Sequence, residues 1–257
     1  MVRDERLKAR IYDVLHRGYP GDVDFYSQVC RGAASVLELG CGMGRVLTRL
    51  AADGVERLVG LDLDPFHLEL AAERLGQAAT VVEGDMREFS LDSERFERVL
   101  IPFNTLYALP SDEDKVACLS AARHHLAPGG VLALDVYAVS AYDMRALPEI
   151  IGSDGDFAFL VELVLEALDA RVVVWDRELP DGSARHYMME YRYDVTFSGG
   201  EQRQLVQKVR HHFTTESDLR RVFTQAGLRI DGFFGDFERR PYRPPCGHFV
   251  VLATAMK

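Results

Sequence analysis

Short apolar runs alternate with longer amphipathic stretches between residues 35 and 136. The amphipathic stretches have helical spacing at about 44–53, 65–76 and 112–126. This alternation is typical of a parallel sheet covered by helices, because each crossover between parallel strands needs a helix-sized connection. The pattern predicts an α/β fold with a turn at 126–130 before its last strand. The expected strands are 35–39, 57–62, 79–84, 98–103 and 131–137.

The segments outside this block have a different pattern. Residues 4–17 and about 22–31 have the spacing of two helices, and glycines and a proline lie between them. Between about 157 and 213, strand-like runs at 171–179, 186–197 and 202–213 are separated by the turn signals PDGS and SGGE, which is typical of antiparallel hairpins. A capped helix at 214–228 and two closing strands at 229–236 and 248–255 complete the chain. We therefore expect an N-terminal helical lid (1–34), a core (35–150 and 214–257) and an antiparallel β insert (151–213).

Composition restricts the classes of partner. The 257 residues include 30 lysines and arginines against 40 acidic residues, a net charge of −10, which argues against a nucleic-acid or anionic-membrane binder. A small neutral or cationic molecule fits this charge better. The four cysteines form no CxxC pair, so we expect no metal and a reducing cytoplasm. The most apolar stretch, 157–168, contains two glutamates and is too short for a membrane span.

The strongest motif is a glycine-rich turn between the first strand and the first helix of the α/β block. Gly40, Gly42 and Gly44 allow positive φ angles and leave room for a ligand against the backbone. Asp62 ends the second strand, where a carboxylate can accept hydrogen bonds from ribose hydroxyls. Asp85 ends the third strand, where it could meet the amino group of adenine. The motif favours a nucleotide-like ligand; a dinucleotide is the alternative, although its third glycine normally comes one residue later.

Four motifs in order resemble those of the class I S-adenosylmethionine-dependent methyltransferases: 38–44, 60–71, 83–89 and 124–137. The resemblance implies a Rossmann-like, doubly wound, mostly parallel seven-stranded sheet and S-adenosyl-L-methionine as cofactor. It assigns Glu38 and Gly40 to the amino-acid end of the cofactor, and the Phe103 carbonyl to its ammonium. Arg45 could reach the cofactor carboxylate or be a solvated arginine. The residues expected to bind the cofactor are Tyr12, Tyr26, Glu38, Gly40, Gly42, Gly44, Arg45, Asp62, Leu63, Asp85, Met86 and Phe103.

The acceptor side is expected at the end of the fourth strand, in the N-terminal segment and in the insert. Residues 12–26 and the insert resemble small-molecule N-methyltransferases, including glycine N-methyltransferase and sugar N,N-dimethyltransferases, in which an aromatic residue covers the cofactor. Tyr12 holds that position here, with Tyr19 and Tyr26 as further candidates. The alternation of side chains in a half-exposed sheet would produce the same set of insert residues even if none of them bound the acceptor. The candidate acceptor-binding residues are Asn104, Tyr107, Tyr137, Trp175, His186 and Tyr191.

The resemblance implies methyl transfer to a small molecule, at nitrogen, by in-line displacement. For a neutral amine, alignment by Tyr12 and Asn104 is sufficient; a hydroxyl or an acidic ring nitrogen needs a base, such as His16, His186 or His248. The expected catalytic residues are Tyr12, His16 and Asn104. The alternatives are an O-methyltransferase of a natural product, an NAD-dependent oxidoreductase and a non-catalytic cofactor-binding protein. A homodimer and a monomer both remain open.

Overall fold

The computed structural model describes residues 2–91, 94–139, 156–180 and 185–256. The chain forms two compact units, each built from separate stretches of sequence. Unit 1 comprises Met1–Arg17 and Ser140–Phe213, and unit 2 comprises Gly18–Val139 and Thr214–Lys257. The two N-terminal helices therefore belong to different units, since α1 (Val2–Leu15) is part of unit 1 and α2 (Asp22–Cys30) is part of unit 2.

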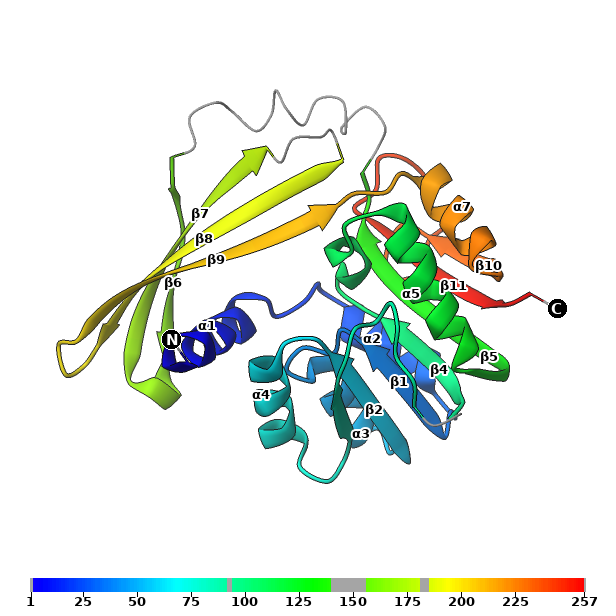
Figure 1. The fold of residues 1–257 in the computed structure, drawn as a ribbon, viewed down its shortest axis with the longest axis horizontal. Helices are drawn as coiled ribbons and strands as arrows, with labels where there is room; N and C mark the ends of the chain where they lie inside the picture. Colours follow the sequence, from blue (N-terminus) through cyan, green and yellow to red (C-terminus); the bar gives the residue numbers. More distant parts are fainter. Residues whose placement is uncertain (1, 92–93, 140–155, 181–184, 257) are drawn as a thin grey trace. The chain divides into compact units, whose positions relative to one another are not determined.

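Unit 2 contains a seven-stranded sheet with the strand order β10-β11-β5-β4-β1-β2-β3. The five adjacent strands β5, β4, β1, β2 and β3 run parallel to one another. Strand β11 is antiparallel to both of its neighbours, β5 and β10. This is the expected Rossmann-like, mostly parallel seven-stranded sheet (Figure 1). Its strands are β1 (Ser35–Leu39), β2 (Arg57–Asp62), β3 (Thr80–Glu83), β4 (Phe96–Ile101), β5 (Leu126–Tyr137), β10 (Leu228–Phe234) and β11 (His248–Ala255).

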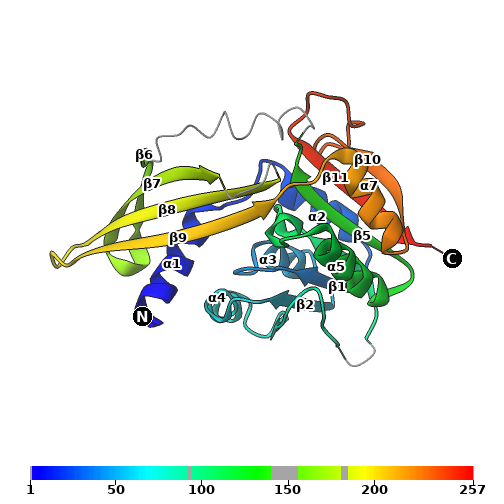
Figure 2. The same cartoon turned by 45° about the horizontal axis from the view of Figure 1, so that its top comes forward.

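Helices cover both faces of this sheet, which makes it doubly wound. The helix α5 packs beside α7 on one face, whereas α2 packs beside α3 on the other (Figures 1 and 2). Every residue of the central strand β1 is buried, as expected for a parallel strand with a helical layer on each side. The remaining helices of unit 2 are α3 (Arg45–Ala52), α4 (Pro65–Leu75), the 3₁₀ turn η1 (Thr105–Ala108), α5 (Asp112–His124) and α7 (Glu216–Gln225).

The prediction of a turn at 126–130 is wrong, because these residues form the start of β5. Leu126 pairs with Phe96, and the next pair joins Val131 to Arg98, so the additional residues of β5 form an irregularity within the ladder. Gly129 takes a φ of +77° there. A Cβ at Gly130 would lie 2.9–3.2 Å from three backbone carbonyl oxygens. The two glycines thus allow a distorted strand where a turn was expected.

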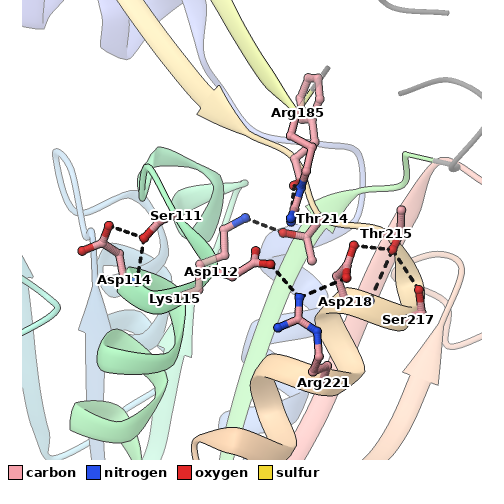
Figure 3. Close-up of polar contacts among 11 residues, drawn as sticks. Ser111, Asp112, Asp114, Lys115, Arg185, Thr214, Thr215, Ser217, Asp218 and Arg221 are labelled. Atoms are coloured by element: carbon pink, nitrogen blue, oxygen red, sulfur yellow. Dashed lines mark hydrogen bonds and ion pairs between the residues drawn. The ribbon is translucent and has the colours of Figure 1, made fainter. Parts of the chain in front are cut away.

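Polar contacts hold the first turns of α5 and α7 together (Figure 3). Ser111 and Thr215 cap the two helices, and each hydroxyl accepts the backbone N–H three residues on, at 3.0 and 3.2 Å. Arg221 of α7 donates to Asp112 of α5 at 2.7 Å and to Asp218 of its own helix at 3.0 Å. These contacts fix the helix pair that covers one face of the sheet.

Unit 1 is an antiparallel sheet with the strand order β6-β7-β8-β9, to which α1 contributes an apolar face. Leu7 and Ile11 of α1 share a core cluster with Val172, Val174 and Tyr193 of the sheet. The SGGE turn joins β8 and β9 as expected, with the N–H of Phe197 donating to the carbonyl of Glu201 at 2.9 Å. The PDGS turn lies largely outside the described residues. The elements that follow α1 in unit 1 are β6 (Ala158–Leu165), η2 (Glu166–Leu168), β7 (Ala170–Pro180), β8 (His186–Phe197) and β9 (Gln202–His212).

None of the helices in the described part of the chain combines the length and the apolar character that crossing a membrane requires.

Candidate cofactor site

The glycine-rich turn lies at the carboxyl end of β1 and is anchored to the neighbouring strand β2. The N–H groups of Gly40 and Cys41 both donate to the carbonyl of Leu61, at 2.7 and 3.0 Å. Gly40, Gly42 and Gly44 all have positive φ, at +65°, +52° and +76°. The sequence therefore forms a tight turn that a chain of L-residues with side chains would form only under strain.

The three glycines have different surroundings. A Cβ at Gly40 would come within 2.2 Å of the Thr105 side chain, and one at Gly44 within 2.8 Å of the Leu75 side chain. At Gly42, no atom of the described residues lies within 4 Å of the same position. A Cβ at Gly40 or Gly44 would thus have to displace a neighbouring side chain, whereas the backbone of Gly42 has open space beside it.

Asp62 fixes the other side of the turn. Its carboxylate accepts the N–H of Gly42 at 2.8 Å and the N–H of Asp64 at 2.9 Å. Burial alone would raise the pKa of Asp62, but the hydrogen bond from His67 and the two backbone amides lower it below the ordinary value. The group is therefore an ionised acceptor beside the turn. The next side chain, Leu63, is 67% exposed and offers apolar surface.

Asp64 caps the start of α4. Its Oδ1 accepts the N–H of Phe66 at 2.8 Å and the N–H of His67 at 3.4 Å, which satisfies two free donors at the start of α4. Asp62 thus holds the glycine-rich turn, whereas Asp64, two residues later, caps a helix.

Glu38 is buried at the end of β1 with an exposed fraction of 3%. Its Oε2 atom has no hydrogen-bond partner in the described part of the chain. Burial raises the pKa of Glu38 to about 8, although the nearby Arg45 acts in the opposite direction. Glu38 thus offers a buried oxygen that a donor from a ligand could satisfy, which fits the expected ammonium of the cofactor.

Asp135 is a buried carboxylate beside Phe103 that the sequence analysis did not single out. Oδ1 accepts the hydroxyl of Tyr26 at 2.5 Å and the N–H of Phe103 at 2.8 Å, while Oδ2 has no partner among the described residues. Burial raises the pKa of Asp135 to about 6. The sequence feature that could have indicated Asp135 is that it is a single aspartate inside the apolar run 131–137. A charge at such a position has to be paired or to serve a ligand.

Arg45 pairs with Asp22 of α2, which neither sequence interpretation anticipated. The two guanidinium nitrogens donate to the two carboxylate oxygens of Asp22 at 2.9 and 2.6 Å. Asp22 is 2% exposed, so this bidentate pair is largely shielded from solvent. A Cβ at Gly18 would come within 2.4 Å of the guanidinium. The pair thus fixes the start of α2 against the start of α3.

Asp85 is paired within the protein. Its carboxylate accepts the Arg87 guanidinium at 2.6 Å, and Arg87 also reaches Asp114 at 2.8 Å. The Arg87 hydrogen bond lowers the pKa of Asp85, so its carboxylate is ionised. Met86 beside it is partly buried. The role of Asp85 and Met86 toward adenine stays a prediction.

The end of β4 is strained, another feature that sequence reasoning did not find. Phe103 and Asn104 follow one another with φ of +54° and +62°, which is unfavourable for residues with side chains. The Asn104 amide donates to the Tyr19 hydroxyl at 2.9 Å and accepts the N–H of Tyr137 at 2.7 Å. Asn104 therefore ties the ends of β4 and β5 to the segment before α2, and its catalytic role stays a prediction.

Tyr26 and Tyr107 are fully buried in unit 2. The Tyr107 hydroxyl donates to the carbonyls of Tyr137 at 3.0 Å and Thr214 at 3.2 Å. This geometry suits a residue that connects β5 to the segment before α7.

We expect Tyr107→Phe to lower the free energy of unfolding by about 1–2 kcal/mol, because two buried carbonyls lose a donor. Urea unfolding checks the loss, and cofactor affinity should stay within about threefold. A Tyr107→Phe protein of normal stability with weakened acceptor binding would instead assign the hydroxyl to the acceptor.

Of the other candidates, His248 lies on β11 of unit 2, with its ring 4.3 Å from that of Tyr19, and the rest lie in unit 1. The structure brings Tyr12, His16 and Tyr191 together: the Tyr12 and His16 rings are 4.0 Å apart, and His16 meets Tyr191 edge-on at 5.5 Å. The His186 ring lies 4.8 Å from that of His212, on the neighbouring strand. The Trp175 ring lies under the Arg192 guanidinium at 4.9 Å. Their roles in catalysis and acceptor binding stay predictions.

A search for groups of at least three histidine, cysteine, aspartate or glutamate side chains that could hold a metal ion finds none within the described residues.

Comparisons with known proteins show which proteins the chain is similar to. Residues 36–130 match the methyltransferase domain family. The cypemycin N-terminal methyltransferase of a Streptomyces species is 38% identical over 102 residues, which are 39% of this chain. Because that match covers 41% of the relative, the chain spans about two fifths of its length.

Two longer matches extend beyond the domain. The dTDP-3-amino-3,4,6-trideoxy-α-D-glucopyranose N,N-dimethyltransferase of Streptomyces venezuelae is 26% identical over 240 residues, covering 87% of this chain and 90% of the relative. The structure of S-adenosylmethionine-bound CalS10, an amino pentose methyltransferase from Micromonospora echinaspora, matches with a TM-score of 0.68 and 26% identity. That match covers 94% of this chain and 96% of CalS10. Residues 36–130 are thus similar to a methyltransferase domain, and nearly the whole chain resembles S-adenosylmethionine-dependent sugar N-methyltransferases in sequence and fold.

Proposed function

We propose that this enzyme transfers the methyl group of S-adenosylmethionine to the amine nitrogen of a small molecule such as an amino sugar. The observation that carries the proposal is the 240-residue match to a sugar N,N-dimethyltransferase. That match takes in most of the chain, including much of unit 1, and so exceeds the family match to residues 36–130. A similarity limited to the cofactor domain would carry no information on the acceptor.

In this proposal unit 2 binds the cofactor. Gly42 gives the backbone access, Asp62 accepts from the ribose, and Glu38 holds the amino-acid end; the buried free oxygen of Glu38 supports this assignment. When bound, the cofactor supplies a methyl group on a sulfonium, which is strongly activated toward a nucleophile. The task of the protein is then to place a lone pair behind that methyl group and to exclude water.

Side chains of unit 1 are proposed to recognise the acceptor. Tyr12, His16 and Tyr191 form one group of rings that could orient an amine and accept its proton. Trp175 and His186 are proposed to contribute to specificity. Asn104 would act as a positioning residue, since its amide holds Tyr19 and the backbone of Tyr137. The cytoplasm is the proposed compartment, which the four free thiols support, and a homodimer stays a prediction.

The proposal predicts a preference for nitrogen over oxygen. Given labelled S-adenosylmethionine and two nucleotide sugars that differ only by an amino or a hydroxyl group, the enzyme should methylate the amine at least about a hundredfold faster. The preference is expected because an uncharged amine needs only alignment, whereas a hydroxyl must also lose its proton. Mass spectrometry of the products checks this, and dimethylated product should follow the monomethylated one. Methylation of the hydroxyl sugar alone would contradict the proposal.

A further inference from the structure

We propose that Glu38 and Asp135 together form a two-carboxylate receptor for the ammonium group of the cofactor, and that cofactor binding releases a proton from this pair. The inference rests on the assignment of S-adenosylmethionine as cofactor. It adds Asp135 to the residue expected from the glycine motif, and it couples binding to the protonation of the site.

Strand register places both carboxylates on the same face of the sheet. Glu38 of β1 pairs with Leu100 of β4, and Leu100 pairs with Ala133 of β5. Residues paired across parallel strands point to one face, and so does the residue two positions further along a strand. Asp135 is two positions after Ala133, so its side chain points to the same face as that of Glu38. The core cluster that contains Leu100 and Ala133 also contains Tyr26 of α2, so α2 covers this face.

The charges on this face do not balance. Arg45 is the cation that both carboxyl groups sense, and its guanidinium is already bound bidentately by Asp22. Glu38, Asp135 and Asp22 are all at least 97% buried. If all three carboxylates were ionised, one guanidinium would face three negative charges. The site is therefore prepared for an additional cation.

The hydrogen bonds have a corresponding deficit. Tyr26 and Phe103 donate to one oxygen of Asp135, while Oδ2 of Asp135 and Oε2 of Glu38 have no donor among the described residues. A buried carboxylate oxygen without a partner loses its hydration with nothing in return. An ammonium group has three donors and a positive charge, so it corrects both deficits. The two free oxygens are what makes this cluster a binding site and more than a group of acidic residues.

Without a ligand, the site reduces its charge by keeping a proton. Burial raises the pKa of Glu38 to about 8 and that of Asp135 to about 6, so at pH 7 Glu38 is mostly protonated and Asp135 mostly ionised. Arg45 lowers the pKa of Glu38, while Asp62 and Asp22 raise it. The pKa of Asp135 is lowered by Tyr26, Phe103 and Arg45 and raised by Asp22.

The remaining ionisable groups that face the pair keep their protons. Burial raises the pKa of the Tyr26 hydroxyl and of the Cys41 thiol, and it raises the pKa of Cys30 to about 12. An arriving ammonium favours ionised Glu38, so the pKa of Glu38 falls on binding and its proton leaves to solvent. Considering the titration of Glu38 alone, the affinity for the cofactor should therefore be highest above pH 8 and should fall as the pH drops below 8.

The test measures proton release directly. Calorimetric titration of the full chain with S-adenosylhomocysteine at pH 7, in buffers with different ionisation enthalpies, should give the release of about one proton. Between pH 6 and 7, the dissociation constant should fall by about tenfold per pH unit for the proton on Glu38, and by somewhat more near pH 6, where Asp135 is also partly protonated. This range avoids the α-amino group of the ligand itself, which titrates near ~7.7–8.0. The probe 5′-methylthioadenosine has no amino-acid end, and it should release no proton and bind independently of pH.

Three variants separate the contributions. Glu38→Gln should remove most of the proton release at pH 7 and leave only the smaller pH dependence that Asp135 contributes near pH 6. Asp135→Asn should lower the affinity for S-adenosylhomocysteine at least about tenfold. Its affinity for 5′-methylthioadenosine should stay within about threefold of wild type. Asp231→Asn removes a carboxylate on β10 that pairs with Arg229 and Thr254, and as a matched control it should behave as wild type. Circular dichroism establishes that each variant is folded.

The outcomes distinguish this inference from the cofactor assignment. Normal binding of S-adenosylhomocysteine with no proton release, or equal release with 5′-methylthioadenosine, would overturn the receptor while leaving the cofactor in place. If Asp135→Asn lowered the affinity for both ligands equally, Asp135 would have a structural role, and the proposed receptor would also be overturned. Absence of binding by either ligand at millimolar concentration would overturn the cofactor assignment itself.

Discussion

Asp62→Ala is expected to weaken S-adenosylhomocysteine binding by about 10²–10³-fold. The carboxylate holds the backbone amides of Gly42 and Asp64 and is assigned to the ribose hydroxyls. Hydrogen bonds to a charged group contribute about 1.5–3 kcal/mol each, so losing the ribose contact and the shape of the turn together costs about 3–4 kcal/mol of binding free energy. Calorimetric titration measures the loss.

The matched control for Asp62 is Asp64→Ala. This change removes a helix cap, so it should lower the free energy of unfolding by about 1 kcal/mol and leave ligand affinity within about threefold. Equal losses of affinity in the two variants would show that the ribose assignment of Asp62 is wrong.

Gly42→Ala is expected to weaken cofactor binding at least about tenfold while the protein stays folded. The new methyl group would meet no atom of the described residues within 4 Å, so it would occupy space that we assign to the ligand. The φ of +52° adds a strain of about 1–2 kcal/mol. Calorimetry and urea unfolding separate the two effects.

Gly54→Ala provides a control with the same strain. Gly54 also has a positive φ, at +85°, and no described atom within 4 Å, but it follows α3 at the opposite end from the glycine turn. Its stability should fall as in Gly42→Ala, with ligand affinity unchanged. If both variants bound the ligand normally, the cofactor would not approach the turn at Gly42.

The parallel core was predictable because its signals are local. The apolar runs at 35–39 and 57–62 match β1 and β2 residue for residue. Each is continuous because helices cover both faces, and the glycines of the first turn have no other common explanation. The cap at Asp64 was predictable for the same reason, since its partners lie two and three residues away.

Other features depend on residues that are distant in sequence. The pairing of Arg45 with Asp22 and of Asp135 with Tyr26 requires knowledge of which helix covers which face. The positive φ angles of Phe103 and Asn104 are imposed by contacts with Asp135, Tyr19 and Tyr137, and the two side chains give no local signal of them.

Strand β6 was not among the expected strands. Its sequence AFLVELVL, followed by Glu166, places glutamates four residues apart as a helix would, and only pairing with β7 makes it a strand. Periodicity alone does not distinguish these two states in a short apolar run.

The packing of α1 within unit 1 has a consequence for synthesis of the chain. Leu7 and Ile11 are translated before unit 2, yet their core partners Val172 and Tyr193 are translated only after most of unit 2. At about 5–20 residues per second, the delay is on the order of ten to thirty seconds. During that interval the apolar stripe of the first helix has no native partner. We therefore expect nascent chains to depend on chaperones at this helix.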